Sequence, residues 1–330
     1  MFESPYIKSF DDNERTIGVE IEFSGLNIDE IGNAITHVIG GETKKKTKYE
    51  AEIINSSLSN YGNFNIELDA SLFKSGKLRD YLNLIGLEDK SSIDNVEDFL
   101  SEVAMEMVPM EVVSPPIPIS KLPVMDEIKE ALRKKSAEGT KDSIINAFGM
   151  HLNPSLPSLK AEDIRDFLRA FVLMYDWLVE KLEIDTSRKL TPYIDSFPKD
   201  YIRHILADGY EPDISTLIDD YLEFNPTRNR PLDMLPLFTF MDEDRVISVV
   251  DDGLTSSRPT FHYRLPNCEI SNPDWSITKE WNYWAMVEKV AHDKNKLNAL
   301  RKEYMDWDEN PTSKFMSVVG EKFKRFWDEA

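Results

Sequence analysis

Two carboxylates near the N-terminus have the spacing of metal ligands on a β-strand. Apolar and polar residues alternate along residues 16–23, which is the period of a half-buried strand. Glu20 and Glu22 therefore share the face opposite the apolar one. Residues two apart on a strand are roughly 7 Å apart, so this pair can hold two neighbouring divalent cations, or one cation and a proton acceptor. The simpler alternative is that both side chains are solvated on an exposed sheet face.

Strands and helices alternate along the chain around this pair. Period-two patterns or short apolar runs predict strands, and apolar residues at i, i+3 and i+4 predict helices. The expected strands are residues 16–23, 49–54, 64–69, 107–113, 144–153 and 261–265. The expected helices are residues 28–39, 91–107, 122–134, 164–182, 277–304 and 315–327. Hairpin-like spacing between the early strands favours an antiparallel sheet with helices packed on one side, an α+β class.

The composition limits the classes of protein to which this chain can belong. A formal net charge of −21 over 330 residues argues against binding to nucleic acid or to anionic membranes, which requires basic patches. The single cysteine excludes an intrachain disulfide or a cysteine metal cluster. The first residues lack the apolar core of a signal peptide and no run of about 18 apolar residues occurs, so we expect a cytoplasmic protein.

Several short motifs follow one another in a specific order. They are Gly18–Phe23, Glu67–Leu72, Glu111–Pro116, Phe148–Asn153, Ser187–Arg188 and Phe261–Leu265. This series resembles the amidoligase family of the glutamine synthetase-like carboxylate–amine ligase superfamily, over residues 16–290. The strand with Glu20 and Glu22 and the Glu-Val-Val-Ser-Pro-Pro stretch are the most specific of these motifs, and the others count through their order.

The resemblance implies a curved antiparallel sheet, like that of the glutamine synthetase catalytic domain, with helices on its convex side. It implies that the concave face binds ATP and Mg²⁺ or Mn²⁺. It also implies that the protein joins a carboxylate substrate to an amine substrate, either of which can be part of a peptide or protein. Residues 16–290 would form the catalytic domain, after a polar lead-in at residues 1–15 and before a helical extension at residues 291–330 packed on the same domain.

The resemblance also assigns roles to individual residues through their positions in these motifs. The implied metal ligands are Glu20, Glu22, Glu111 and His151. Asp69 would lie at the cleft, where a carboxylate is able to accept the proton that the amine must lose. Arg188 and Arg264 would contact phosphate or the acyl intermediate, because a guanidinium fork matches phosphate geometry.

The last motif departs from the family at one position. Where the family usually has Glu-Phe-Arg, this chain has His262, Tyr263 and Arg264. Magnesium prefers oxygen ligands, so an imidazole is a poor replacement for that carboxylate. Either His262 serves as a ligand to a different metal such as Mn²⁺, or one metal position is weakened and the enzyme is slow or inactive.

These residues also have ordinary structural interpretations. His151 can stabilise a local turn, and Arg264 can form a salt bridge on the sheet face. Arg188 can be exposed in a loop, and Asp69 can cap a turn or a helix. Arg230 belongs to a small positive cluster on an otherwise acidic protein, which makes it a further candidate for phosphate binding.

The sequence therefore predicts an ATP-dependent carboxylate–amine ligase that forms an amide or peptide bond through an acyl phosphate. Two alternatives use the same residues. One is a catalytically degenerate member of the family that binds a nucleotide or a peptide. The other is a metal-dependent hydrolase built on the same carboxylates and His151.

Overall fold

The computed structural model of the protein describes residues 1–68, 109–142, 148–190, 194–250, 253, 255–309, 320–324 and 327. Within these ranges, no helix has the length and apolar character needed to cross a lipid bilayer. Asp69 and the helix expected over residues 91–107 lie outside the described residues. The strands expected over residues 107–113 and 144–153, and the helix expected over residues 315–327, lie partly outside them.

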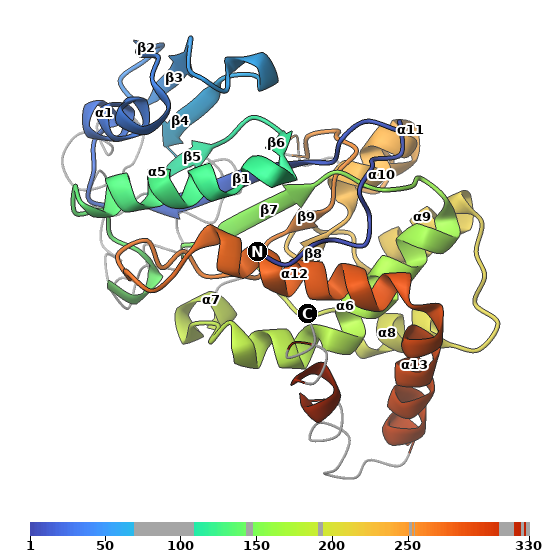
Figure 1. The fold of residues 1–330 in the computed structure, drawn as a ribbon. Helices are drawn as coiled ribbons and strands as arrows, with labels where there is room; N and C mark the ends of the chain where they lie inside the picture. The colour runs from blue at the N-terminus through green and yellow to red at the C-terminus, as the bar shows by residue number, and fades with distance from the viewer. Residues whose placement is uncertain are drawn as a thin grey trace, which may run out of the picture.

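A large open antiparallel sheet organises the fold (Figure 1). Its strands follow the order β2-β3-β4-β5-β1-β7-β9-β8, and β6 pairs with β1 off this path. The strands are β1 (Thr16–Phe23), β2 (Glu42–Lys45), β3 (Glu50–Ile54), β4 (Phe64–Leu68), β5 (Met110–Val113), β6 (Ile117–Pro118), β7 (Met150–Pro154), β8 (Leu232–Asp233) and β9 (His262–Tyr263). The pairings among these strands are antiparallel, which confirms the predicted α+β class.

β1 lies in the middle of the sheet, between β5 and β7. Its four apolar residues are fully buried, while Glu20 and Glu22 lie on the opposite, partly exposed face. The alternation predicted from the sequence is thereby confirmed. It also specifies the strand register, because a shift of one residue would move both glutamates into the core.

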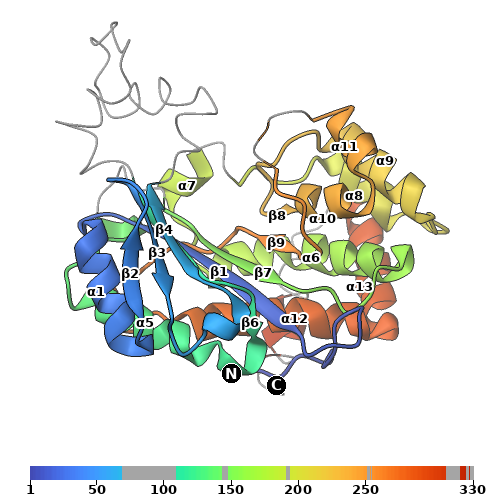
Figure 2. The ribbon, with the colours of Figure 1, turned by 90° about the horizontal axis from the view of Figure 1, so that it is seen from above.

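Helices cover the apolar face of the sheet (Figure 2). They are α1 (Ile28–Ile39), α5 (Pro123–Arg133), α6 (Ala161–Lys181) and α12 (Ile277–His292). From α6, Phe167 packs on Phe261 with ring centroids 4.6 Å apart, and Phe171 meets Tyr263 of β9 edge-on. These aromatic contacts join the helical layer to the last strands of the sheet.

The remaining helices lie mostly beyond β8 and β9, where α8, α9, α10 and α11 gather (Figure 2). Their bounds are α7 (Thr186–Leu190), α8 (Lys199–Leu206), α9 (Ile214–Phe224), α10 (Leu235–Met241), α11 (Glu243–Ile247) and α13 (Lys294–Glu309). The apolar segment that the sequence shows around Pro236 is therefore the short strand β8 followed by α10.

α1 shows how local sequence sets the limits of a helix. The Asn27 side chain accepts hydrogen bonds from the N–H groups of Asp29 and Glu30, and the Glu30 carboxylate accepts one from the N–H of Asn27. This reciprocal capping box satisfies backbone donors that the first turn leaves unpaired. Gly40 ends the helix with a φ of 70°, in the left-handed region that favours glycine. The helix predicted over residues 28–39 is confirmed.

The single long helix predicted over residues 277–304 is wrong. The chain forms α12 and α13 instead, and Asp293 between them has φ −86° and ψ 88°, outside the helical region. The Asp293 side chain accepts a hydrogen bond from the N–H of Lys296 and so caps the start of α13. Both helices pack against α6, so the apolar spacing continues across the break and does not reveal it.

Candidate active site

The strand register places acidic and imidazole side chains next to one another on the polar face of the sheet. Glu22 of β1 lies opposite Glu111 of β5, which lies opposite Glu67 of β4. On the other side of β1, Glu20 lies opposite His151 of β7. Paired residues on one face of a sheet have Cβ atoms about 4.5–5.5 Å apart. Residues distant in sequence are therefore brought within reach of a shared ligand.

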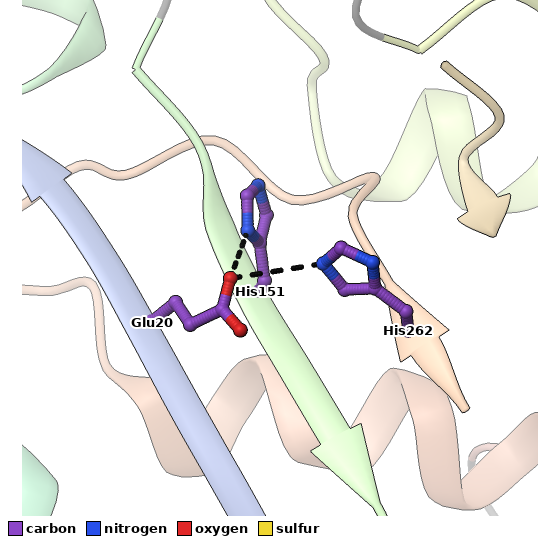
Figure 3. Close-up of side chains that lie close together, drawn as sticks. All are labelled: Glu20, His151 and His262. Atoms are coloured by element: carbon purple, nitrogen blue, oxygen red, sulfur yellow. Dashed lines mark hydrogen bonds and ion pairs between the residues drawn. The ribbon is translucent and has the colours of Figure 1, made fainter. Parts of the chain in front are cut away.

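Glu20, His151 and His262 form the first of two groups (Figure 3). His151 Nδ1 is 2.8 Å from Glu20 Oε2, and His262 Nε2 is 3.7 Å from the same oxygen. The two imidazole rings meet edge-on with centroids 5.2 Å apart. One carboxylate oxygen and two ring nitrogens thus lie within 4.8 Å of one another, on side chains that are at most 12% exposed.

Asp233 contacts His262 on the side away from Glu20. Its Oδ2 is 3.3 Å from His262 Nδ1, and its Oδ1 accepts a hydrogen bond from the N–H of Leu235 at the start of α10. In the tautomer that pairs the two side chains, His262 Nδ1–H donates to Asp233 and the lone pair is on Nε2. Among the residues that the structure describes, that Nε2 is buried and has no hydrogen-bond partner. A buried, unpaired acceptor aimed at a carboxylate fits a nitrogen that ligates a metal.

Glu22, Glu111 and His151 form the second group, whose ligand atoms also lie within 4.8 Å of one another. His151 Nε2 is 3.6 Å from Glu22 Oε1, and the N–H of Gly149 donates to Glu22 Oε2 at 2.7 Å. His151 therefore belongs to both groups, with Nδ1 facing Glu20 and Nε2 facing Glu22. The second group is richer in oxygen than the first, which is the donor type that Mg²⁺ prefers.

Burial and contacts within the first group produce protonation states that suit cation binding. Burial by itself raises the pKa of Glu20, but the hydrogen bond with His151 is the largest of the contacts that outweigh burial and hold the pKa well below the ordinary value. Burial lowers the pKa of His151 to about 3, although Glu20 opposes this shift. At neutral pH Glu20 is ionised and His151 is neutral, the forms in which these side chains bind metals.

Arg188 lies beside the second group, in α7. The interpretation of Arg188 as an exposed loop residue is wrong, because it is only 2% exposed. Its Nη1 donates to the carbonyl oxygen of Leu265 at 2.7 Å and its Nη2 to that of Arg264 at 2.9 Å. A Cβ built on Gly149 would lie 2.8 Å from Arg188 Nη2 and 2.9 Å from His151 Nε2. Glycine at this position therefore lets both side chains approach the strand closely.

Two residues that the sequence analysis did not propose also contact Glu20. Asn153 Nδ2 donates to Glu20 Oε1 at 2.9 Å. Arg258 Nη2 is 3.0 Å from Asn153 Oδ1 and 3.4 Å from Glu20 Oε1. Asn153 is two residues after His151 on the same strand, so the period-two pattern already carried a signal for it. Arg258 lies before β9 in an irregular segment, where periodicity offers no signal.

The remaining predicted residues differ in how close they lie to this site. The β7–β9 register puts Arg264 opposite His151; Arg264 is 7% exposed and donates to a backbone carbonyl oxygen at 2.7 Å. Arg230 donates to Asn225 Oδ1 at 2.9 Å and lies over an aromatic ring, so its described contacts are structural. Asp69 lies outside the described residues, one position beyond the end of β4.

A cavity of about 500 Å³ adjoins Glu20. It is lined by the N-terminal segment, by the polar face of β1 and β5, and by the segment before β9, including Phe10, Gly18, Glu20, Val113, Asn153 and Arg258. A concave space of this size, with apolar walls and a few polar groups at one end, has the properties of a small-molecule site. The structure thus places a ligand-sized space directly against Glu20 of the first group.

A family model described as "Putative amidoligase enzyme" matches residues 13–286, which include all the strands described above and both groups of candidate ligands. No curated protein and no solved structure matches the chain significantly.

Proposed function

Because the chain belongs to the amidoligase family, we propose that it is an ATP-dependent carboxylate–amine ligase. The observation that carries this proposal is the convergence on one sheet face of Glu20, Glu22, Glu111, His151 and His262. Joining a carboxylate to an amine requires the carboxylate to approach the triphosphate of ATP, and both are anionic. A site for this reaction must therefore hold cations where the two meet.

We also propose that the sheet is the curved sheet of a glutamine synthetase-like catalytic domain spanning residues 16–290, with residues 291–330 as a helical extension. The polar face of the sheet would be its concave side. The support for this arrangement is that α1, α5, α6 and α12 cover the apolar face, opposite the glutamates and histidines of β1, β5, β7 and β9.

Mg²⁺ or Mn²⁺ would be held at two neighbouring positions, one in each group. The buried, unpaired Nε2 of His262 and the ionised carboxylate of Glu20 support a cation at the first. Glu22 and Glu111 would hold a cation at the second. Bound cations supply charge neutralisation of the phosphates and polarise the phosphoryl group that is transferred.

Arginine side chains of the chain would orient the anionic groups of the substrates. Arg258 lines the cavity together with Glu20, and its fork can pair there with a carboxylate or a phosphate. Arg264 and Arg188 would support the phosphates from the β9 side, and Arg230 is a more distant candidate for the same role. The cavity beside Glu20 would enclose the body of one substrate and exclude water from it.

The proposed reaction has two steps. A carboxylate oxygen of the first substrate attacks the terminal phosphorus of ATP, ADP leaves, and an acyl phosphate forms. The amine of the second substrate then attacks the acyl carbon, the bond from that carbon to the phosphate oxygen breaks, and inorganic phosphate leaves. The amine also loses a proton, for which we propose Asp69 as the acceptor.

Hydroxylamine provides a test that does not require the natural amine, because it converts an acyl phosphate to a hydroxamate. We expect the protein, with ATP and a divalent cation, to form ADP and a hydroxamate only when a suitable carboxylic acid from a pooled set is present. The oxygen lost by an isotopically labelled acid should appear in the inorganic phosphate. ADP formation that is independent of any acid would contradict the ligase mechanism.

His262 favours a second candidate function, a nucleotide- or peptide-binding protein without turnover. In that case ATP with a cation would raise the melting temperature by mass action, as any ligand of the native state does. No hydroxamate would form with any acid in the pool. The two functions are therefore separated by measuring thermal stabilisation and product formation in the same samples.

A further inference from the structure

The nitrogen content of the first group distinguishes it from the second. We propose that the point between Glu20, His151 and His262 is a site for a first-row transition cation in preference to Mg²⁺. We further propose that Asp233 is the residue that positions His262 for this cation. This inference refines the cation requirement of the proposed function and depends on it only for the role of the bound ion.

The orientation of His262 is the first argument. Asp233 is 1% exposed and His262 is 3% exposed, so water does not provide alternative partners for either side chain. Asp233 Oδ2 accepts a hydrogen bond from the N–H at His262 Nδ1, and the Nε2 lone pair then faces Glu20. A histidine that ligates a metal through one nitrogen commonly donates its other N–H to a carboxylate, which fixes the ring and makes it a better ligand.

The distances within the group are the second argument. Metal–ligand bonds of roughly 2.0–2.2 Å place two ligand atoms of one ion about 3–3.5 Å apart. His151 Nδ1 lies 2.8 Å from Glu20 Oε2, and His262 Nε2 lies 3.7 Å from it. These two separations bracket the expected spacing, so small rotations of the side chains complete a ligand set of two nitrogens and one oxygen.

The shared histidine is the third argument. Imidazole is a good ligand for first-row transition cations, whereas Mg²⁺ prefers oxygen. When His151 binds a cation through Nδ1, the neutral ring carries its proton on Nε2, 3.6 Å from Glu22 Oε1. Glu22 and Glu111 then offer only oxygen to the neighbouring position, which suits Mg²⁺. The protein would thereby bind a transition cation at the first position and Mg²⁺ at the adjacent one.

Titrations of the nucleotide-free full-length protein with Co²⁺ and with Mg²⁺ test this selectivity. We expect one Co²⁺ ion to bind at least tenfold more tightly than Mg²⁺, with a visible spectrum that reports nitrogen ligands. The His262→Glu variant should lose most of this preference, because it replaces a nitrogen ligand by oxygen. Equal affinity of the wild-type protein for the two ions would overturn the proposal.

The Asp233→Asn variant tests the positioning role without changing the volume of the side chain. The oxygen of an asparagine at this position must accept the N–H of Leu235, so its NH₂ group would face His262 and donate to Nδ1. His262 would then carry its proton on Nε2 and could not ligate. We expect Co²⁺ affinity to fall by about 10- to 100-fold, with Mg²⁺ affinity unchanged. Unchanged Co²⁺ affinity in a folded variant would overturn the role of Asp233.

Another histidine–aspartate pair outside the site provides the matched control. His204 Nε2 is 2.9 Å from Asp220 Oδ2, so Asp220→Asn makes the same chemical change elsewhere and should leave Co²⁺ affinity unchanged. If Asp233→Asn does not fold, His262→Gln replaces it, and retention of the Co²⁺ preference in that variant would overturn the proposal.

These titrations contain neither ATP nor an acid, so their outcome is independent of turnover. Selective Co²⁺ binding without any hydroxamate product supports the cation site and overturns the ligase proposal. Hydroxamate formation by a protein that does not prefer Co²⁺ to Mg²⁺ supports the ligase proposal and overturns the proposed cation site.

Discussion

At the scale of single residues, the site depends most on His151. Its two nitrogens face Glu20 and Glu22, so it links the two groups of candidate ligands. Its position depends on Gly149, two residues earlier on the same face, which leaves space for the ring and for the Arg188 guanidinium. A substitution of His151 or of Gly149 therefore disturbs the site, while the other candidate ligands keep their side chains.

Gly149→Ala should displace His151. The added Cβ would lie 2.8–2.9 Å from Arg188 Nη2 and His151 Nε2, too close for ordinary contact. We expect the free energy of unfolding to fall by about 1–3 kcal/mol through overpacking. We also expect the cation-dependent stabilisation by ATP to be lost. Urea denaturation and melting curves measure these two effects, and a variant with native stability and native ATP response would show that the approach at Gly149 is unimportant.

Glu20→Ala should abolish the rise in melting temperature that ATP causes in the presence of Mn²⁺ or Mg²⁺, while the protein stays folded. Glu20 provides the oxygen that both histidines of the first group face. The matched control is Glu52→Gln on β3, which removes a charge that is paired with Lys46 at 2.6 Å instead of with a histidine. Persistence of the ATP effect in the Glu20 variant, or its loss in the Glu52 control, would count against the assignment of the cation site.

At the scale of elements, α12 secures the segment that leads into β1. Arg15, just before the strand, forms a bidentate ion pair with Glu288 of α12, with Nη2–Oε1 at 2.7 Å and Nη1–Oε2 at 2.9 Å. Both side chains are at most 1% exposed, and Trp284 Nε1 donates a further hydrogen bond to Glu288. The start of the strand that carries Glu20 is thereby tied to the helix behind the sheet.

Glu288→Ala should lower the free energy of unfolding by about 3–5 kcal/mol, because it leaves the buried Arg15 guanidinium without its counter-charge. Urea denaturation provides the measurement. The double variant Arg15→Met with Glu288→Leu should recover much of the loss, since apolar residues of similar volume avoid the desolvation cost of the pair. A single variant as stable as the wild type would mean that the ion pair does not secure the strand.

At the scale of the whole molecule, one buried carboxyl group makes stability depend on pH. Burial raises the pKa of Glu280 in α12 to about 8, although a hydrogen bond from Trp275 opposes this shift. The folded protein keeps this proton at pH values where the unfolded chain has lost it. The contribution of Glu280 to stability is therefore fully present below the ordinary pKa of about 4.5 and is lost as pH rises through 8.

Glu280→Gln should raise the melting temperature near pH 8 and above, and should change it little near pH 5. Each pH unit between the two pKa values is worth roughly 1.4 kcal/mol, so the gain at high pH amounts to several kcal/mol. Melting curves of both proteins across this pH range provide the measurement. A difference between wild type and variant that does not depend on pH would contradict the raised pKa.

A feature of this protein was predictable from its sequence when the residues that produce it are close together along the chain. The alternation in β1, the helical spacing of residues 28–39 and the order of the family motifs are patterns within short stretches of sequence, so they were readable without a structure. The same patterns placed Glu20 and Glu22 on one face, and they gave no sign of the break at Asp293 because both flanking helices pack on α6.

Only the tertiary structure decided which distant residues meet. The alternation of side chains along a strand assigns His262 to one face of the sheet, but it does not show which residues lie beside His262 on that face. The sequence around Asp233 and Arg258 likewise gives no sign that they lie near Glu20. These contacts follow from strand order and register, through which β7, β9 and β8 pair successively beside β1. Side-chain periodicity reports which way a residue points, whereas the chemistry of a site depends on which other strands the fold places beside it.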